Sequence, residues 1–181
     1  MELTVTYILS QIFTILMYIF LGVTYQVKDR YKILFFCILA NTSQGIAYLL
    51  LNAYSGLIMC ILAVIRDIAL ILISDRIKDE EKQRKANLLV IIVFFVIAII
   101  SAIPTYDGFW SLFSIFATLI YTYSIWQKNE TLYKLLGSPV GICWIIYNTA
   151  VKSIFGIILE SMLLITSIVG YIRSKKTKST K

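Results

Sequence analysis

Residues 57–74 read LIMCILAVIRDIALILIS, which is apolar apart from the adjacent Arg66 and Asp67 and the final Ser74. At ~1.5 Å per residue, a helix of this length approaches the ~30 Å hydrocarbon thickness of a bilayer. Six further stretches have a similar length and composition: 7–25, 33–51, 88–103, 109–126, 135–150 and 154–172. The sequence therefore predicts an all-α, polytopic membrane protein with seven transmembrane helices.

The basic residues fall in alternate gaps between these stretches. All but two of the 17 Lys and Arg residues lie after the first, third or fifth stretch or in the C-terminal tail. Basic loops stay on the cytoplasmic side of a membrane. We therefore expect the N-terminus outside and the C-terminus in the cytoplasm, with Arg66 and Lys152 as the two exceptions to the pattern.

Composition excludes several classes of protein. With 59% hydrophobic residues in a chain of 181, there is no room for a soluble domain beside a single integral membrane domain. The orientation of the helices in the membrane already explains the basic residues, and with them the net charge of +7. We therefore expect the lipid bilayer as the partner and no nucleic acid. A homo-oligomer is left open.

The residue types of the chain do not favour a metal site, a cofactor or an enzymatic activity. The chain has no His, and Cys37, Cys60 and Cys143 all fall inside apolar stretches without a C-x-x-C pairing. An intramembrane hydrolase needs a nucleophile with a base. We therefore expect no metal site, no cofactor and no enzymatic activity.

Two short matches suggest an internal repeat. Residues 31–34 (YKIL) resemble 133–136 (YKLL), and Ser55-Gly56 resembles Phe155-Gly156, at separations of 102 and 100 positions. Two units four spans apart run in the same direction, which predicts a 3+1+3 parallel-repeat bundle.

The repeat divides the chain into four segments. They are a first three-helix unit (1–76), a cytoplasmic loop with a linker helix (77–106), a second three-helix unit (107–173) and a basic tail (174–181) that we expect to be disordered. The charged residues around the pair Glu81–Lys85 are able to extend a helix beyond the membrane surface.

Arg66 is the most unusual residue, because it falls near the middle of its stretch. A mid-bilayer Arg costs roughly 2.5–3.5 kcal/mol unless it meets a partner or water. Asp67 points about 100° away on a helix and is a poor partner, whereas Glu160 in the seventh stretch lies at a depth within about 4.5 Å. The expected Arg66–Glu160 pair either locks two helices together or lines a path for substrate.

Polar residues recur at helical spacing in four stretches, which predicts polar faces. They are Gln11, Thr14 and Tyr18; Asn41, Gln44, Tyr48 and Asn52; Ser111, Ser114, Thr118 and Tyr121; and Trp144 with Asn148. One such face is ordinary helix–helix contact, but four suggest either a hydrated binding cavity or dry structural networks.

Pro139 in the sixth stretch lies between Gly137 and Gly141. A Pro within a helix removes one backbone hydrogen bond, so this segment either bends as a gate or simply begins the helix.

Several of these residues resemble the YgjV family of bacterial inner-membrane proteins. They are the run 143–148 (CWIIYN) with Gly156, Glu160 and Arg173, the run 61–66 (ILAVIR), and Gln11. Two positions depart from the family pattern: Ala63 stands where an Asn is expected, and Asp67 is unmatched. The resemblance implies a multi-pass protein of the bacterial inner membrane.

The layout is also similar to that of the SWEET, semiSWEET and PQ-loop transporters, by architectural analogy alone. Those proteins usually carry a hinge Pro in the first span of each triplet, and neither 7–25 nor 109–126 contains Pro. Gating by that hinge is therefore not carried over.

Two functions fit these observations. The first is a small polar solute transporter or facilitator with SWEET-like alternating access and a site between the two triplets. Arg66 and Glu160 are its charged groups and Trp144 stacks on the solute, while Asn41, Gln44 and Asn148 hydrogen-bond it beside Tyr48 and Gln11. The alternative is a non-transporting accessory or regulatory protein with a sealed polar core.

Overall fold

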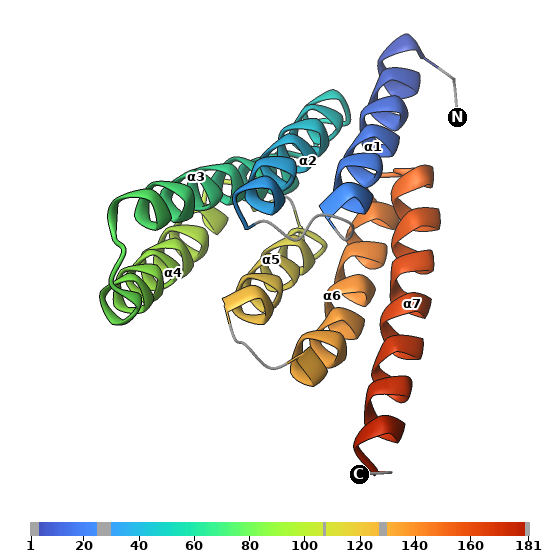
Figure 1. The fold of residues 1–181 in the computed structure, drawn as a ribbon. Helices are drawn as coiled ribbons and strands as arrows, with labels where there is room; N and C mark the ends of the chain where they lie inside the picture. The colour runs from blue at the N-terminus through green and yellow to red at the C-terminus, as the bar shows by residue number, and fades with distance from the viewer. Residues whose placement is uncertain (1–3, 25–29, 107, 127–129, 180–181) are drawn as a thin grey trace. The chain divides into compact units, whose positions relative to one another are not determined.

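The computed structural model describes residues 4–24, 30–106, 108–126 and 130–179. Within these residues the chain forms seven α-helices and no strand (Figure 1). The helices are α1 Val5–Thr24, α2 Arg30–Leu50, α3 Tyr54–Arg76, α4 Glu80–Ala102, α5 Ser111–Trp126, α6 Glu130–Ala150 and α7 Ile154–Ser179. The predicted all-α fold is confirmed, and each helix overlaps one predicted apolar stretch.

Four helices are long and apolar enough to cross a membrane, counted over the described residues. They are Val5–Thr24, Tyr31–Leu50, Tyr54–Arg76 and Glu80–Ser101. The apolar parts of α5, α6 and α7 are shorter, at 10–17 residues each. A bilayer crossing by these three helices, the 3+1+3 layout and the sides of the two termini stay predictions.

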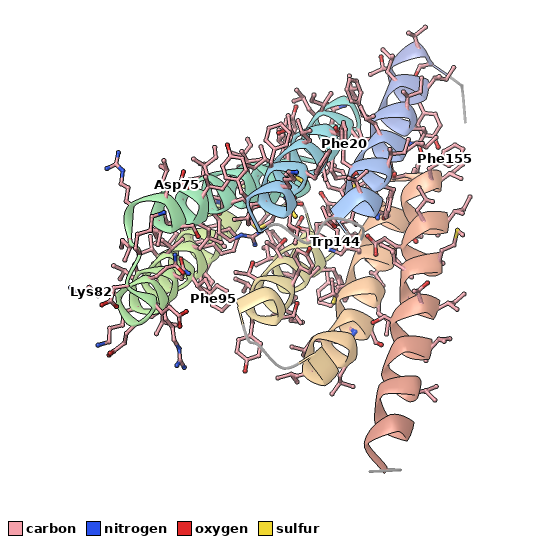
Figure 2. The ribbon with its side chains drawn as sticks, in the orientation of Figure 1. Phe20, Asp75, Lys82, Phe95, Trp144 and Phe155 are labelled. Atoms are coloured by element: carbon pink, nitrogen blue, oxygen red, sulfur yellow. The ribbon has the colours of Figure 1, made fainter. Side chains whose placement is uncertain are left out.

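The charged segment between α3 and α4 belongs mostly to a helix. Only residues 77–79 are not helical. Asp79 caps α4, because its side chain accepts a hydrogen bond from the Lys82 amide at 2.9 Å. One turn later, Lys85 Nζ lies 2.7 Å from Glu81 Oε1, which confirms the predicted i,i+4 pair. Figure 2 shows Asp75 and Lys82 at this end of the α3–α4 hairpin.

The C-terminal tail differs from expectation. We expected residues 174–181 to be disordered, but α7 continues to Ser179. Lys is a good helix former, and basic side chains near a helix C-terminus interact favourably with its dipole. The polar composition of this segment therefore does not end the helix.

The chain divides into two compact units, Met1–Tyr106 with α1–α4 and Asp107–Lys181 with α5–α7. In the first unit α1 packs on α2, α2 on α3 and α3 on α4, and in the second α5 packs on α6 and α6 on α7. Within each unit, every helix thus lies against its neighbour in sequence, as short connections favour.

The turn of the α2–α3 hairpin matches that of the α6–α7 hairpin. Asn52 and Lys152 both adopt the left-handed conformation, with φ of 56° and 59°. In the first turn the Ala53 amide donates to Tyr48 O at 2.8 Å and Asn52 N to Leu49 O at 3.1 Å. This pair of bonds is a Schellman motif, which ends a helix by satisfying its last carbonyls.

The second turn repeats these bonds one hundred positions later. There the Ser153 amide donates to Asn148 O at 2.9 Å and Lys152 N to Thr149 O at 3.2 Å. The predicted correspondence of Gly56 with Gly156 therefore extends to the backbone of the turn that precedes each of them.

Candidate functional site

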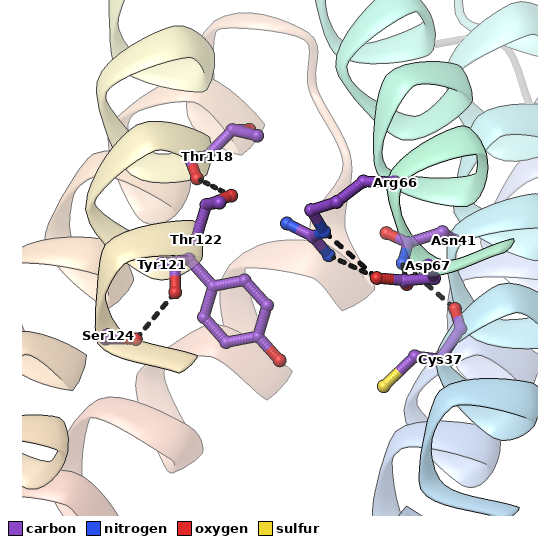
Figure 3. A network of polar contacts seen from close by, with 8 residues as sticks. All are labelled: Cys37, Asn41, Arg66, Asp67, Thr118, Tyr121, Thr122 and Ser124. Atoms are coloured by element: carbon purple, nitrogen blue, oxygen red, sulfur yellow. Dashed lines mark hydrogen bonds and ion pairs between the residues drawn. The ribbon is translucent and has the colours of Figure 1, made fainter. Parts of the chain in front are cut away.

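Arg66 and Asp67 form a buried ion pair within α3. Their exposed fractions are 4% and 2%. Both Arg66 Nε and Nη2 lie 2.9 Å from Asp67 Oδ1 (Figure 3). Two short charge-assisted contacts to one oxygen neutralise both groups locally.

The expectation that Asp67 is a poor partner for Arg66 is wrong. Adjacent Cβ atoms do diverge by about 100° on a helix. The Arg side chain is long enough to turn back along the helix surface, however, so its head group reaches the short Asp67 side chain. Direction at Cβ fixes the contacts of short side chains much better than those of long ones.

The pair is surrounded by residues from the two neighbouring helices. Asn41 Nδ2 on α2 donates to Cys37 O at 2.9 Å and makes a long contact of 3.5 Å with Asp67 Oδ2. On α4 the Phe94 ring centre lies 5.2 Å from the guanidinium carbon of Arg66, within the range of a cation–π interaction. Residues of α2, α3 and α4 thus stabilise the charges from three sides.

The polar face predicted on α2 is present, with one correction. Gln44 and Tyr48 are buried, with exposed fractions of 5% and 1%, and Asn41 is partly buried. Asn52, predicted on the same face, lies beyond the helix in the exposed turn. The face therefore ends at Tyr48.

The buried residues of α1 are all polar: Ser10, Gln11 and Thr14. Gln11 Nε2 donates to Ser10 Oγ at 3.1 Å, and Thr14 Oγ1 donates to Ser10 O at 3.0 Å. Tyr18 is half-buried. The apolar residues of α1 are more exposed than these three polar residues. The apolar face of the helix therefore points outward, and its polar face points into the first unit.

In the second unit, Asn148 and Glu160 are buried where α6 packs on α7, with exposed fractions of 2% and 7%. A Cβ at Gly156 would lie 2.7 Å from Asn148 Cγ, and one at Gly141 would lie 3.3 Å from Leu164 Cβ. Glu160 falls midway between Gly156 and Leu164, four residues from each, so it lies on the face of α7 that meets α6.

Trp144 belongs to the same face of α6, between Gly141 and Asn148. Its ring lies 5.9 Å from the Tyr147 ring in an edge-on arrangement. Trp144, Asn148 and Glu160 therefore share one helix–helix seam. The predicted pairing of Glu160 with Arg66 joins the two units and stays a prediction.

Helix α5 carries a ladder of buried hydroxyls. The hydroxyls of Ser114, Thr118 and Thr122 donate to backbone carbonyls three or four residues earlier, at 2.7–2.9 Å. Figure 3 shows the bond from Thr122 to the Thr118 carbonyl. Ser111 is buried beside them, and Tyr121 is half-buried. Bonds of this kind satisfy each hydroxyl proton within its own helix.

Pro139 lies inside α6, nine residues after the helix begins at Glu130. The interpretation as a helix-start Pro is therefore wrong. A Cβ at Gly137 would overlap Ser167 Oγ and lie 3.2 Å from Ser167 Cβ. Gly137 and Gly141 thus allow close approach of α7 on both sides of Pro139.

The described residues contain no group of three or more His, Cys, Asp or Glu side chains that could hold a metal ion. Three buried side-chain atoms in the described residues have no hydrogen-bond partner: Gln44 Oε1, Asn87 Oδ1 and Ser153 Oγ. Such atoms are rare in folded proteins, because a buried polar atom normally has a protein or water partner.

The family model Imp-YgjV, described as bacterial inner membrane protein, matches residues 8–178. The chain belongs to this family. No curated protein and no solved structure is significantly similar to it. The helices of this Imp-YgjV protein therefore lie in the bacterial inner membrane, which they cross several times.

Six buried polar residues of this Imp-YgjV protein were not singled out from the sequence: Ser10, Ser43, Asn87, Thr122, Ser124 and Ser153. Ser10 lies four positions before Thr14, and Thr122 lies four positions after Thr118. Their helical spacing from predicted polar residues was therefore the available signal. Ser43 donates to Leu39 O at 2.9 Å, as do many Ser residues inside helices.

Proposed function

We propose that this chain is a transporter or facilitator in the bacterial inner membrane, and that it moves a small polar solute. The observation that carries the proposal is the buried Arg66–Asp67 pair in α3, a helix long and apolar enough to cross a membrane. Two ionised groups inside a membrane span are expensive, and they mark substrate or ion pathways more often than packing contacts. Helix adhesion alone needs neither charge.

The proposal assigns solute binding to polar and aromatic side chains of each unit. Asn41, Gln44 and Tyr48 lie on one face of α2, and Gln11 is buried on α1. In the second unit, Glu160 supplies a carboxylate, Trp144 a stacking surface and Asn148 an amide. Aromatic surface with a few polar groups suits a small polar ligand.

Alternating access of the SWEET type is the proposed mechanism. The equivalent turns at Asn52 and Lys152 support a repeat of related helical hairpins. Repeated units that rock against each other expose a midplane site to either side of the membrane in turn. In this mechanism the residues bind and orient the solute and carry out no chemistry on it.

Uptake into proteoliposomes tests this proposal. The panel contains sugars, carboxylates, amino acids and vitamins, and protein-free liposomes give the background. We expect uptake of at least one class and its loss in Arg66→Ala. A folded wild-type protein that moves none of them, or equal uptake by Arg66→Ala, would refute the proposal.

A non-transporting accessory protein is the second candidate, and one observation favours it. The hydroxyls of Ser114, Thr118 and Thr122 are satisfied within α5, and Arg66 is satisfied by Asp67. A polar core sealed in this way needs no solute. It predicts that cysteines placed at Asn41, Gln44 and Asn148 stay shielded from membrane-impermeant thiol reagents.

A further inference from the structure

Gln44 contains a buried acceptor that lacks a donor. The residue is 5% exposed, and its Oε1 has no hydrogen-bond partner. An amide oxygen taken out of water without a donor is unfavourable, and it is normally satisfied by a water molecule or a ligand. A ligand that binds beside this oxygen must therefore donate a hydrogen bond to it.

The neighbouring helices define the surroundings of Gln44. On α2, Asn41 faces α3 through Asp67, and Phe36 faces α1 through its ring contact with Phe20, at 6.4 Å between ring centres. At 100° per residue, Gln44 lies about 60° from Asn41 and about 80° from Phe36, between these two directions. Its side chain therefore begins on the side of α2 that lies between α1 and α3.

The contact between Phe20 and Phe36 also gives the position of Gln44 along the helix axis. Phe20 lies near the end of α1 and Phe36 near the start of α2, so the two helices run antiparallel. About nine residues further from that contact lie Gln11 on α1 and Gly45 on α2. A Cβ at Gly45 would lie 3.4 Å from Cys60 Cβ, which brings α3 to the same level. Gln44 and the buried Gln11 thus share a layer of the first unit.

One turn away, the buried charges of Arg66 and Asp67 cancel each other. Arg66 and Asp67 contact each other twice at 2.9 Å, and the Asn41 amide approaches the second carboxylate oxygen. A neutral pair attracts a net charge on a ligand far less than either ion alone would. This layer of the first unit therefore contains amide side chains and a neutralised ion pair. Gln44 Oε1 is its hydrogen-bond acceptor for a solute.

We infer that the transported solute carries no net charge and donates an O–H or N–H hydrogen bond to Gln44 Oε1 in the first unit. This inference rests on the proposed function and names its substrate class. Polyols and zwitterionic amino acids belong to the class, whereas simple organic anions do not.

The test uses three probes with three carbons each: glycerol, alanine and lactate. We expect wild-type proteoliposomes to take up glycerol or alanine in preference to lactate. Gln44→Met keeps the length of the side chain but removes the acceptor, and loss of one such hydrogen bond lowers uptake about five- to tenfold. Gln83→Met is the matched control, since Gln83 lies in the charged first part of α4.

Thermal melting of the same two variants provides a second readout. Because Gln44 Oε1 is unsatisfied without solute, Gln44→Met should melt at a higher temperature than wild type. Alanine or glycerol should then raise the melting temperature of wild type more than that of Gln44→Met. A structural water on Gln44 would instead give a lower melting temperature and unchanged uptake.

The outcomes separate this inference from the proposed function. Preferred uptake of lactate, or unchanged uptake by Gln44→Met, overturns the inference and leaves transport standing. Absence of uptake for these three probes and for the wider panel, by protein that melts cooperatively, overturns the proposed function itself.

Discussion

Removal of Asp67 should destabilise the first unit strongly, because it leaves Arg66 buried without its counter-charge. The perturbation is Asp67→Leu, compared with Arg66→Met and with the double variant. Both side chains are almost fully enclosed, with exposed fractions of 4% and 3%. Neither charge can therefore turn to water after its partner is removed.

The magnitude follows from the geometry of the pair. With two contacts at 2.9 Å, the charge centres are about 4 Å apart, and their attraction at an effective dielectric of 20 is about 4 kcal/mol. Removing one member of a buried pair costs about 3–5 kcal/mol, whereas replacing both with apolar residues is nearly neutral. We expect a coupling energy of about 3 kcal/mol from the double-mutant cycle.

Exposure of Cys60 to a fluorogenic thiol reagent reports the unfolding. Cys60 is a buried residue of α3, and replacing Cys37 and Cys143 with Ala makes it the sole reporter. Unfolding in mixed micelles then gives the free energy for each variant. All three Trp residues lie in the second unit, so their fluorescence monitors that unit separately.

The exposed pair Glu81–Lys85 is the control for this cycle. Its contact is as short, at 2.7 Å, but its side chains are 78% and 76% exposed. Such pairs contribute about 0.3–0.5 kcal/mol. A coupling energy between Arg66 and Asp67 as small as that of the control pair would refute the reasoning.

Three further predictions concern stability, each measured by thermal melting. Gly156→Ala should cost about 1–3 kcal/mol, since its Cβ would lie 2.7 Å from a packed side chain, whereas Gly22→Ala has open space and should be neutral or stabilising. Lys152→Gly should stabilise by about 1 kcal/mol and Asn52→Gly by less, because Asn tolerates the left-handed conformation. Asp79→Ala should cost about 1 kcal/mol and speed amide hydrogen exchange in the first turn of α4.

The sequence predicted the positions of the helices well, because hydropathy reports burial in lipid directly. Helix ends were less predictable where charge continues a helix past the apolar part, as in α7 beyond residue 172 and α6 before residue 135. A charged helix and a charged loop have similar hydropathy. Capping at Asp79 and the Glu81–Lys85 pair distinguish them locally.

The polar residues were found by helical spacing, but their partners were not. Spacing assigns Gln44 and Tyr48 to one face of α2, yet it does not tell which oxygen lacks a donor. Asp67 was rejected as a partner of Arg66 on direction alone, although the flexible Arg side chain reverses that conclusion. The contact of Asn148 with Gly156 depends on the turn at Lys152, whose left-handed conformation no periodicity predicts.

Thiol labelling in intact cells tests the central claim, that solute reaches the polar interior. In a background without native cysteines, Asn41, Gln44 and Asn148 are changed singly to Cys and exposed to a membrane-impermeant reagent. The turn residue Asn52 and the exposed apolar residue Ile97 of α4 serve as accessible and lipid-facing controls. We predict labelling at two or more of the three interior positions. Labelling at Asn52 with none at the interior positions would contradict transport.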